Sequence, residues 1–118
     1  MRRLLVLSVA LGAISLPAAA SAAVLIEAIP KSLVCGDPIT PGIWAQPGTT
    51  GSRVVRMRAV DRATGRVWWR KTASARTSGW RNWTLPSGMG GRCRRTTIVY
   101  DGPGFVTRFR VRFTSEGS

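Results

Sequence analysis

The 118-residue sequence contains no histidine, five acidic residues and two cysteines. Without histidine, the chain lacks the commonest general base and the commonest metal ligand. Two cysteines are too few for an all-cysteine zinc site, although they suffice for one disulfide. These absences disfavour an enzyme or a metalloprotein, and a chain of this length forms one domain at most.

The few acidic residues are also poorly placed for catalysis. Asp37, Asp61 and Asp101 lie in turn-like segments, where aspartate caps the backbone. Glu27 falls in an expected strand and Glu116 near the end of the chain. The sequence pairs no two carboxylates for acid/base work and contains no acidic calcium loop. We therefore expect no catalytic residue, no metal site and no cofactor.

The N-terminus has the layout of a secretory signal peptide. Arg2 and Arg3 precede an apolar run over residues 4–16, and small residues follow at positions 20–22. We predict a signal over residues 1–23, cleaved after Ala22 or Ala23, and an exported domain over residues 24–118. The alternative is an uncleaved anchor, because residues 4–26 carry no charge and a membrane span needs about 20 such residues.

Negative charge is scarce beside positive charge. The chain has 18 Lys and Arg against 5 Asp and Glu, a formal net charge of +13. Removal of the predicted signal takes away only Arg2 and Arg3, so the excess belongs to the exported part. Few acids are available to offset it, which favours an anionic partner.

Hydrophobic periodicity predicts an all-β domain. No window repeats apolar residues with the helical spacing, whereas several windows alternate between apolar and polar residues. In residues 53–60, Val55 and Met57 alternate with arginines; in residues 105–113, Phe109 and Val111 do the same. This pattern is typical of strands with one apolar and one cationic face.

Turn residues join these strands into two expected hairpins. Residues 61–65, ending in Gly65, would connect the first strand to the next, and residues 101–104 would connect strands 94–100 and 105–113. Further short strands are expected at residues 24–29, 42–46 and 80–85. About seven short strands without a helix predict a small antiparallel β-sandwich of immunoglobulin-like or jelly-roll type.

The two cysteines predict a stabilising cross-link. Exported chains fold in an oxidising space, so we expect Cys35 and Cys93 to form a disulfide. Intermolecular pairing or two free thiols is the alternative.

Arginine and tryptophan supply the candidate binding surface. Neighbours in a strand point to opposite faces, so Trp68 and Trp69 cannot both enter the core of a regular strand. The spacing of Trp80 and Trp83 has the same consequence. Depending on the hairpin loop, Trp69 or Trp68 should lie opposite Arg58, with Arg70 or Lys71 nearby, while Arg95 should lie opposite or diagonal to Arg110. The candidate binding residues are Arg56, Arg58, Trp68, Trp69, Arg95, Arg108, Arg110 and Arg112.

Three functions fit this pattern. The first is a non-catalytic secreted or cell-envelope domain that binds an anionic envelope polymer, an acidic polysaccharide or a lipid surface through an Arg/Trp face. The second is a neutral carbohydrate-binding module that uses exposed tryptophans. The third is a structural, protein-interaction or inhibitor domain that presents residues 30–52. Export disfavours nucleic acid as a partner, and we expect no transmembrane segment in the mature form.

Overall fold

A computed structural model describes residues 4–6 and 23–115 of the chain. One 3-10 turn, η2 (Met89–Gly91), precedes the penultimate strand. The strands, in chain order, are β1 (Leu4–Val6), β2 (Val24–Glu27), β3 (Ser32–Val34), β4 (Gly42–Ala45), β5 (Val54–Asp61), β6 (Val67–Ser74), β7 (Arg81–Asn82), β8 (Thr96–Gly102) and β9 (Phe105–Thr114).

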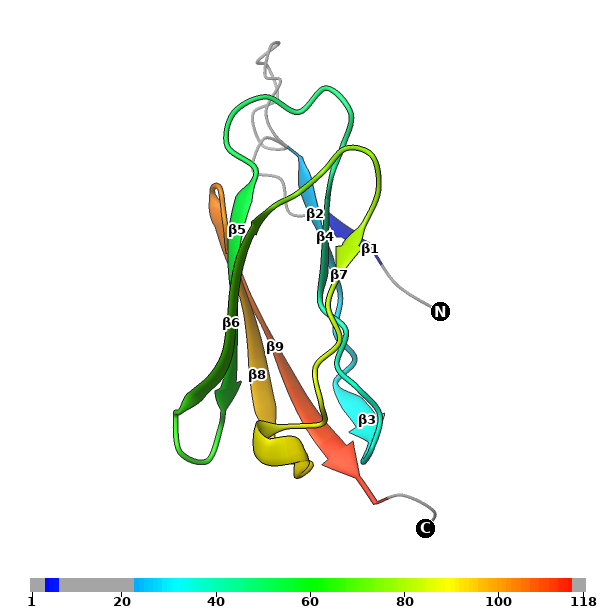
Figure 1. Ribbon diagram of the computed structural model, residues 1–118, viewed down its shortest axis with the longest axis vertical. Helices are drawn as coiled ribbons and strands as arrows, with labels where there is room; N and C mark the ends of the chain where they lie inside the picture. The colour runs from blue at the N-terminus through cyan, green and yellow to red at the C-terminus, as the bar shows by residue number, and fades with distance from the viewer. Residues whose placement is uncertain (1–3, 7–22, 116–118) are drawn as a thin grey trace.

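The strands form two sheets that face each other (Figure 1). One sheet has the order β1-β2-β4-β7 and the other the order β3-β9-β8-β5-β6. All pairs are antiparallel except β3 with β9, which is parallel. The predicted all-β sandwich is confirmed. Within the described ranges, no helix has the length and apolar character needed to cross a membrane.

Most of the predicted signal peptide lies outside the described residues. Residues 4–6 and residue 23 are the exceptions. Residues 4–6 form β1 and pair with β2, Leu4 lying opposite Glu27 and Val6 opposite Leu25. Cleavage of the signal stays a prediction. In a chain that begins at residue 24, β2 would lose this neighbour.

The two predicted hairpins are present. Gly65 closes the β5–β6 turn with a φ of 76° and Gly104 closes the β8–β9 turn with a φ of 84°, conformations that glycine adopts without strain. Asp61 caps the first turn, since its carboxylate accepts a hydrogen bond of 2.8 Å from the backbone N–H of Ala63.

Two segments differ from the prediction. The strand expected at residues 80–85 pairs only at Arg81 and Asn82, and Leu85 forms an isolated bridge with Ile39 instead. Pro86 then stops the segment. Residues 30–52 contribute the edge strand β3, for which no separate range was predicted, and the interior strand β4, which was expected at residues 42–46. They are therefore not a single free loop of the kind an inhibitor presents.

The core lies between the two sheets. Alternate residues of β5, Val55, Met57 and Ala59, are at most 2% exposed. They meet Ile26 and Ile43 from the opposite sheet in one apolar cluster. This alternation explains why a domain so rich in arginine can still bury a continuous core.

Tyr100 joins the two sheets by hydrogen bonds. Its ring is fully buried on β8, and its hydroxyl accepts a bond of 3.0 Å from the N–H of Gly42 on β4. The same hydroxyl donates a bond of 3.0 Å to the carbonyl of Glu27 on β2. One side chain therefore bridges the five-stranded sheet to two strands of the other sheet.

The predicted disulfide is confirmed. Cys35 and Cys93 are bonded, with their Cα atoms 5.4 Å apart and a sequence separation of 58. Cys35 follows β3, where its N–H donates to the carbonyl of Thr114, and Cys93 precedes β8. The bond indicates an oxidising, extracytoplasmic environment.

Replacing Tyr100 by phenylalanine tests the bridge between the sheets. Y100F should lower the free energy of unfolding by about 1–3 kcal/mol, because it removes both hydrogen bonds of the hydroxyl and leaves the buried Gly42 N–H without this acceptor. Denaturant unfolding measures this change. Thr97→Val, which removes a hydroxyl from the outer side of the same strand, is the matched control, and equal losses in the two variants would contradict the bridge.

Alkaline unfolding gives a second test of the same residue. Burial raises the pKa of Tyr100 above its ordinary value of 10.0, the negative charge of Glu27 adds to the rise, and the Gly42 N–H opposes it. Because the folded state disfavours the phenolate, stability should be constant below pH 10.0 and fall above it. As the chain has a single tyrosine, tyrosinate absorbance should appear together with unfolding. Ionisation without unfolding would contradict this prediction.

Removing the disulfide should destabilise the domain strongly. Closure of a loop of this length contributes about 4 kcal/mol through the entropy of the unfolded chain. Cys35→Ser combined with Cys93→Ser should lower the free energy of unfolding by that amount in denaturant titrations. Reduction of the unsubstituted protein should shift its unfolding midpoint equally, and an unchanged midpoint after reduction would refute the assignment of stability to this bond.

Candidate functional site

Three arginines project from β9 on the side away from the core. Arg108, Arg110 and Arg112 are exposed, whereas Val111 between them is fully buried and Phe109 packs against the core. The cause is the two-residue period of the strand, which the sequence pattern had already indicated.

The β5–β6 hairpin adds three more arginines to the same face. Arg56 and Arg58 alternate with the buried core residues of β5 and therefore point outward. Arg58 lies opposite Arg70 of β6, and Arg56 lies opposite Thr72. The expectation that an indole would lie opposite Arg58 is wrong, while the expectation that Arg70 would join this row is met.

Two further arginines extend the face beyond the end of the ladder. The N–H of Arg62 donates to the carbonyl of Arg95 at 3.0 Å, which continues the β5–β8 pairing by one residue. Since Thr97 is the partner of Arg110, Arg95 lies diagonal to Arg110, as one of the two predicted registers required. Arg62 also lines a hollow together with Arg110 and Arg112.

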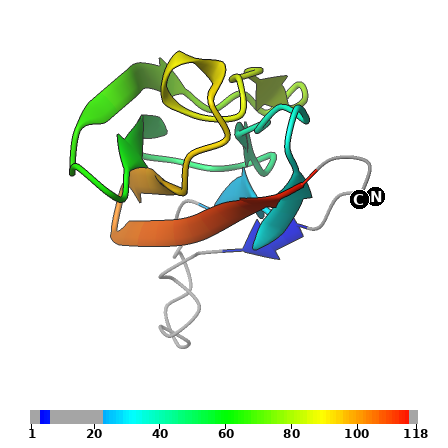
Figure 2. The same cartoon turned by 90° about the horizontal axis from the view of Figure 1, so that it is seen from below.

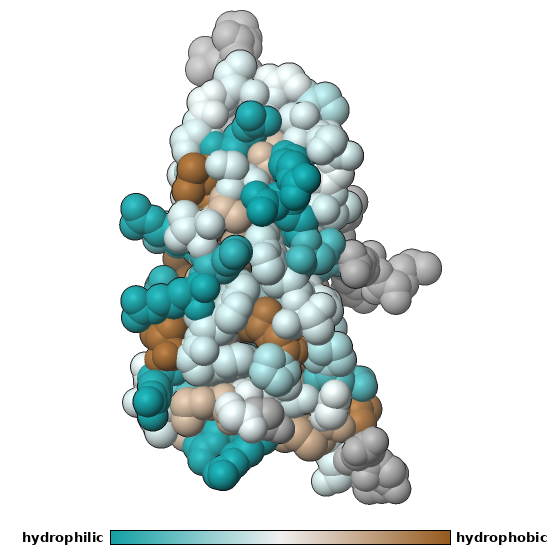
Figure 3. Space-filling model, in the orientation of Figure 1, coloured by the Kyte–Doolittle hydropathy of each residue, from teal (hydrophilic) through white to brown (hydrophobic). Residues whose placement is uncertain are grey.

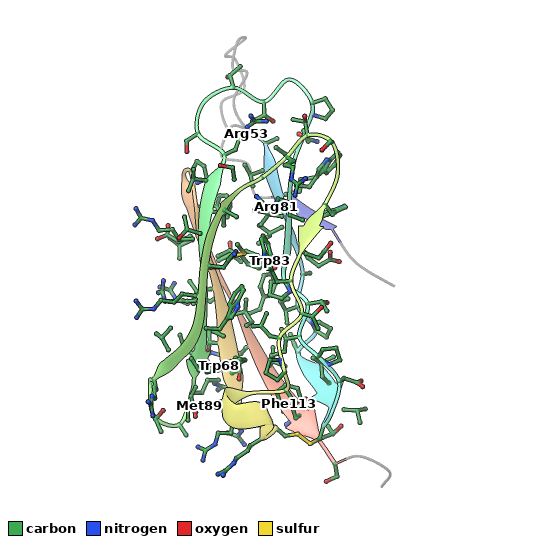
Figure 4. All side chains as sticks on the ribbon, in the orientation of Figure 1. Arg53, Trp68, Arg81, Trp83, Met89 and Phe113 are labelled. Carbon is green, nitrogen blue, oxygen red and sulfur yellow. A yellow bond between two sulfur atoms is a disulfide. The ribbon has the colours of Figure 1, made fainter. Side chains whose placement is uncertain are left out.

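These residues form one surface, which we call the arginine face. Its members are Arg56, Arg58, Arg62, Arg70, Arg95, Arg108, Arg110 and Arg112. In Figures 3 and 4, hydrophilic and nitrogen-tipped side chains extend to the left of β5 and β6, away from the four-stranded sheet. Among the described residues of these strands, the carboxylate on this side is that of Asp101, opposite Arg56.

The arginine face has a covered apolar centre. Val99 points outward from β8 and is absent from the core cluster, yet it is only 2% exposed. Its neighbours in the same row are Arg58 on one side and Arg108 on the other. The side chains around Val99 therefore shield it, as the aliphatic stems of arginine often do while the guanidinium stays in water.

A hollow of about 530 Å³ opens where β9 meets the segment that leads into β3. It is lined by two apolar residues, Ile29 and Phe109, and by Ser32, and the remaining lining residues are all cationic. These are Lys31, Arg62, Arg108, Arg110 and Arg112. We call this hollow the β9 notch.

Trp68 and Trp69 do not lie on the arginine face. Trp69 is opposite Ala59, which is fully buried, and the register shifts between Ala59 and Val60. The shift leaves Trp68 as the extra residue of a β-bulge, and both rings pack against the core. A bulge breaks the strict alternation from which an outward tryptophan was expected here. The two predicted tryptophan site residues thus serve packing.

Trp80 and Trp83, the second closely spaced pair, were expected to lie on opposite sides, and only one of them packs against the core. Trp83 packs against the core, with its ring centroid 6.5 Å from that of Trp69. It lies between the sheets beside Arg81, whose guanidinium carbon is 5.6 Å from the Trp83 centroid (Figure 4). Trp80 is not part of the core cluster and instead lies 6.0 Å from the ring of Trp44.

Trp44 and Trp80 are an aromatic pair that the sequence did not single out. Trp44 is opposite Leu25 on the outer side of the four-stranded sheet, and its indole N–H donates to the carbonyl of Thr77 at 3.3 Å. Both rings are half-buried. Neighbours in a strand point to opposite faces, so assigning Ile43 to the core predicts that Trp44 points outward.

The acidic side chains whose contacts the structure shows have structural roles. Asp61 is fully buried, and its second carboxylate oxygen lies 3.4 Å from a guanidinium nitrogen of Arg94. In the part of the chain that the structure describes, no three His, Cys, Asp or Glu side chains cluster as metal ligands would.

The site is therefore defined by charge and geometry. A cationic sheet surface ends in a notch with a partly apolar lining, and an aromatic pair lies on the opposite sheet. Comparison of the chain with models of protein families, with curated proteins and with solved structures finds no significant match.

Proposed function

We propose that this protein is a non-catalytic, exported domain that binds anionic polymers of the cell envelope through its arginine face. Acidic wall polymers, acidic polysaccharides and anionic lipid surfaces share the required chemistry. The observation that carries the proposal is the gathering of arginines on one side of one sheet, where the described strands bear a single carboxylate.

The electrostatic repulsion within the arginine face supports the proposal of an anionic ligand. Arg58 and Arg70 are direct cross-strand partners, and like charges in that position destabilise a sheet. A polyanion would relieve the repulsion along the whole face. Guanidinium groups suit this task because they bind carboxylate and phosphate oxygens in a bidentate manner.

The proposed location rests on two independent features. The disulfide fits an oxidising compartment, and residues 1–23 have the layout of an export signal. An exported polycation meets envelope polymers before it meets nucleic acid, which is why the latter is not our choice.

A neutral carbohydrate module is the second candidate. Trp68 and Trp69 no longer support it, but the half-buried Trp44–Trp80 pair offers two tilted rings 6.0 Å apart on the other sheet. Sugar rings stack on such surfaces. This candidate predicts binding that depends on Trp44 and not on salt.

Salt and arginine substitution test the proposal together. Affinity for a soluble anionic polymer should fall by about a thousandfold between about 50 and about 200 mM salt, because binding releases counterions from several contacts. Arg108→Gln, Arg110→Gln and Arg112→Gln combined should weaken binding and flatten this salt dependence. Isothermal titration at two salt concentrations measures both effects.

A charge-matched variant distinguishes binding through the arginine face from binding through net charge alone. Arg53→Gln, Arg76→Gln and Arg92→Gln remove the same charge from positions outside the face and should leave most of the affinity intact. Equal losses in the two triple variants would reject a defined surface. Salt-independent binding that Trp44→Ala abolishes would favour the carbohydrate module.

A further inference from the structure

One edge of the five-stranded sheet is only partly covered. Residues 32–34 of β3 pair with residues 112–114 of β9, and that ladder includes no earlier residue of β9. Among the described residues, positions 105–110 of β9 therefore have a strand neighbour on the β8 side alone. Figure 2 shows β9 at the margin of its sheet, with β3 beside its C-terminal end.

On the open edge, backbone N–H and C=O groups of β9 point toward the position that a neighbouring strand would occupy. The N–H of Arg112 donates to the carbonyl of Lys31 at 3.0 Å, and the carbonyl of Thr114 accepts from Cys35 at 2.8 Å. Backbone groups of alternate residues in a strand point to the same side. The N–H and C=O groups of Arg110 and Arg108 hence point to the open side, in line with β3.

The β9 notch lies along this edge and has two kinds of wall. Ile29 and Phe109, which pack toward the core, line one part. Arg108 and Arg110, which belong to the arginine face, line another. A β-strand placed beside β9 would have one row of side chains over the apolar wall and the other row among the guanidinium groups.

We propose that the β9 notch binds an extended acidic peptide of another protein, which adds to β9 as a further strand. Backbone hydrogen bonds with Arg108 and Arg110 provide the pairing, as in other cases of strand addition. The peptide alternates Asp or Glu, set opposite the two arginines, with apolar residues that contact Ile29 and Phe109.

Other occupants fit the notch less well. A second copy paired through its own β9 would bring Arg108 and Arg110 against the same arginines, and such like-charge pairs are destabilising. A phosphate or sugar polymer has no regular series of donors and acceptors to match both the N–H and the C=O groups of the edge. The inference is independent of the proposed polyanion binding, which needs side chains only.

Synthetic peptides test the proposal with the full chain. An eight-residue peptide of alternating Glu and Val should bind and should slow hydrogen exchange at the amides of Arg108 and Arg110. A peptide of the same composition with its glutamates in one block, and an alternating peptide with methylated backbone nitrogens, should bind at least about fivefold more weakly. Equal binding of all three peptides, or no added amide protection, would overturn strand addition.

Two matched variants locate the binding. Arg108→Gln with Arg110→Gln should weaken the alternating peptide about two- to fivefold for each residue, the size of a cross-strand charge pair. Arg56→Gln with Arg70→Gln, on the same face but on strands away from this edge, should leave peptide affinity unchanged while lowering affinity for an anionic polymer. Peptide loss in the second variant equal to that in the first would refute the notch as the site.

Discussion

The hydroxyl of Tyr100 fixes the position of the two sheets relative to each other. The hydroxyl is hydrogen-bonded to the backbone of both β2 and β4, so one residue of β8 contacts the four-stranded sheet at two points. β8 is also the strand between β9 and β5, which carry most of the arginine face. The burial of this one phenol therefore sets where the core lies and, by parity, which residues of the neighbouring strands point outward.

The arginine face combines two properties that are often treated as alternatives. Its side chains shield outward Val99 from water, which is what a solvated surface does. The same guanidinium groups stand opposite one another across strands, as Arg58 and Arg70 do, which a surface designed only for solubility would avoid. The packing role thus explains the stems of these residues, and the proposed anionic ligand would explain their charged ends.

The predictable parts of the molecule are those governed by short-range periodicity. The outward row of β9 and the turns at Gly65 and Gly104 followed from alternation and from turn chemistry. Trp68 did not, because a bulge at Ala59 and Val60 changes the parity and no local sequence feature marks it. β3 received no range of its own because residues 32–34 gain their pairing from the distant β9 and carry no local strand pattern. The notch depends on that same long-range contact.

The parallel pairing of β3 with β9 also bears on when the domain can form. Ser32 lies opposite Arg112, so β3 can pair only after β9, the last strand among the described residues, has been synthesised. Contacts so far apart in sequence are slow to form, and the sheet cannot be completed while the C-terminal residues are still being synthesised. Closure of this edge is therefore a late step of folding, and the disulfide between Cys35 and Cys93 joins the segment after β3 to the segment before β8.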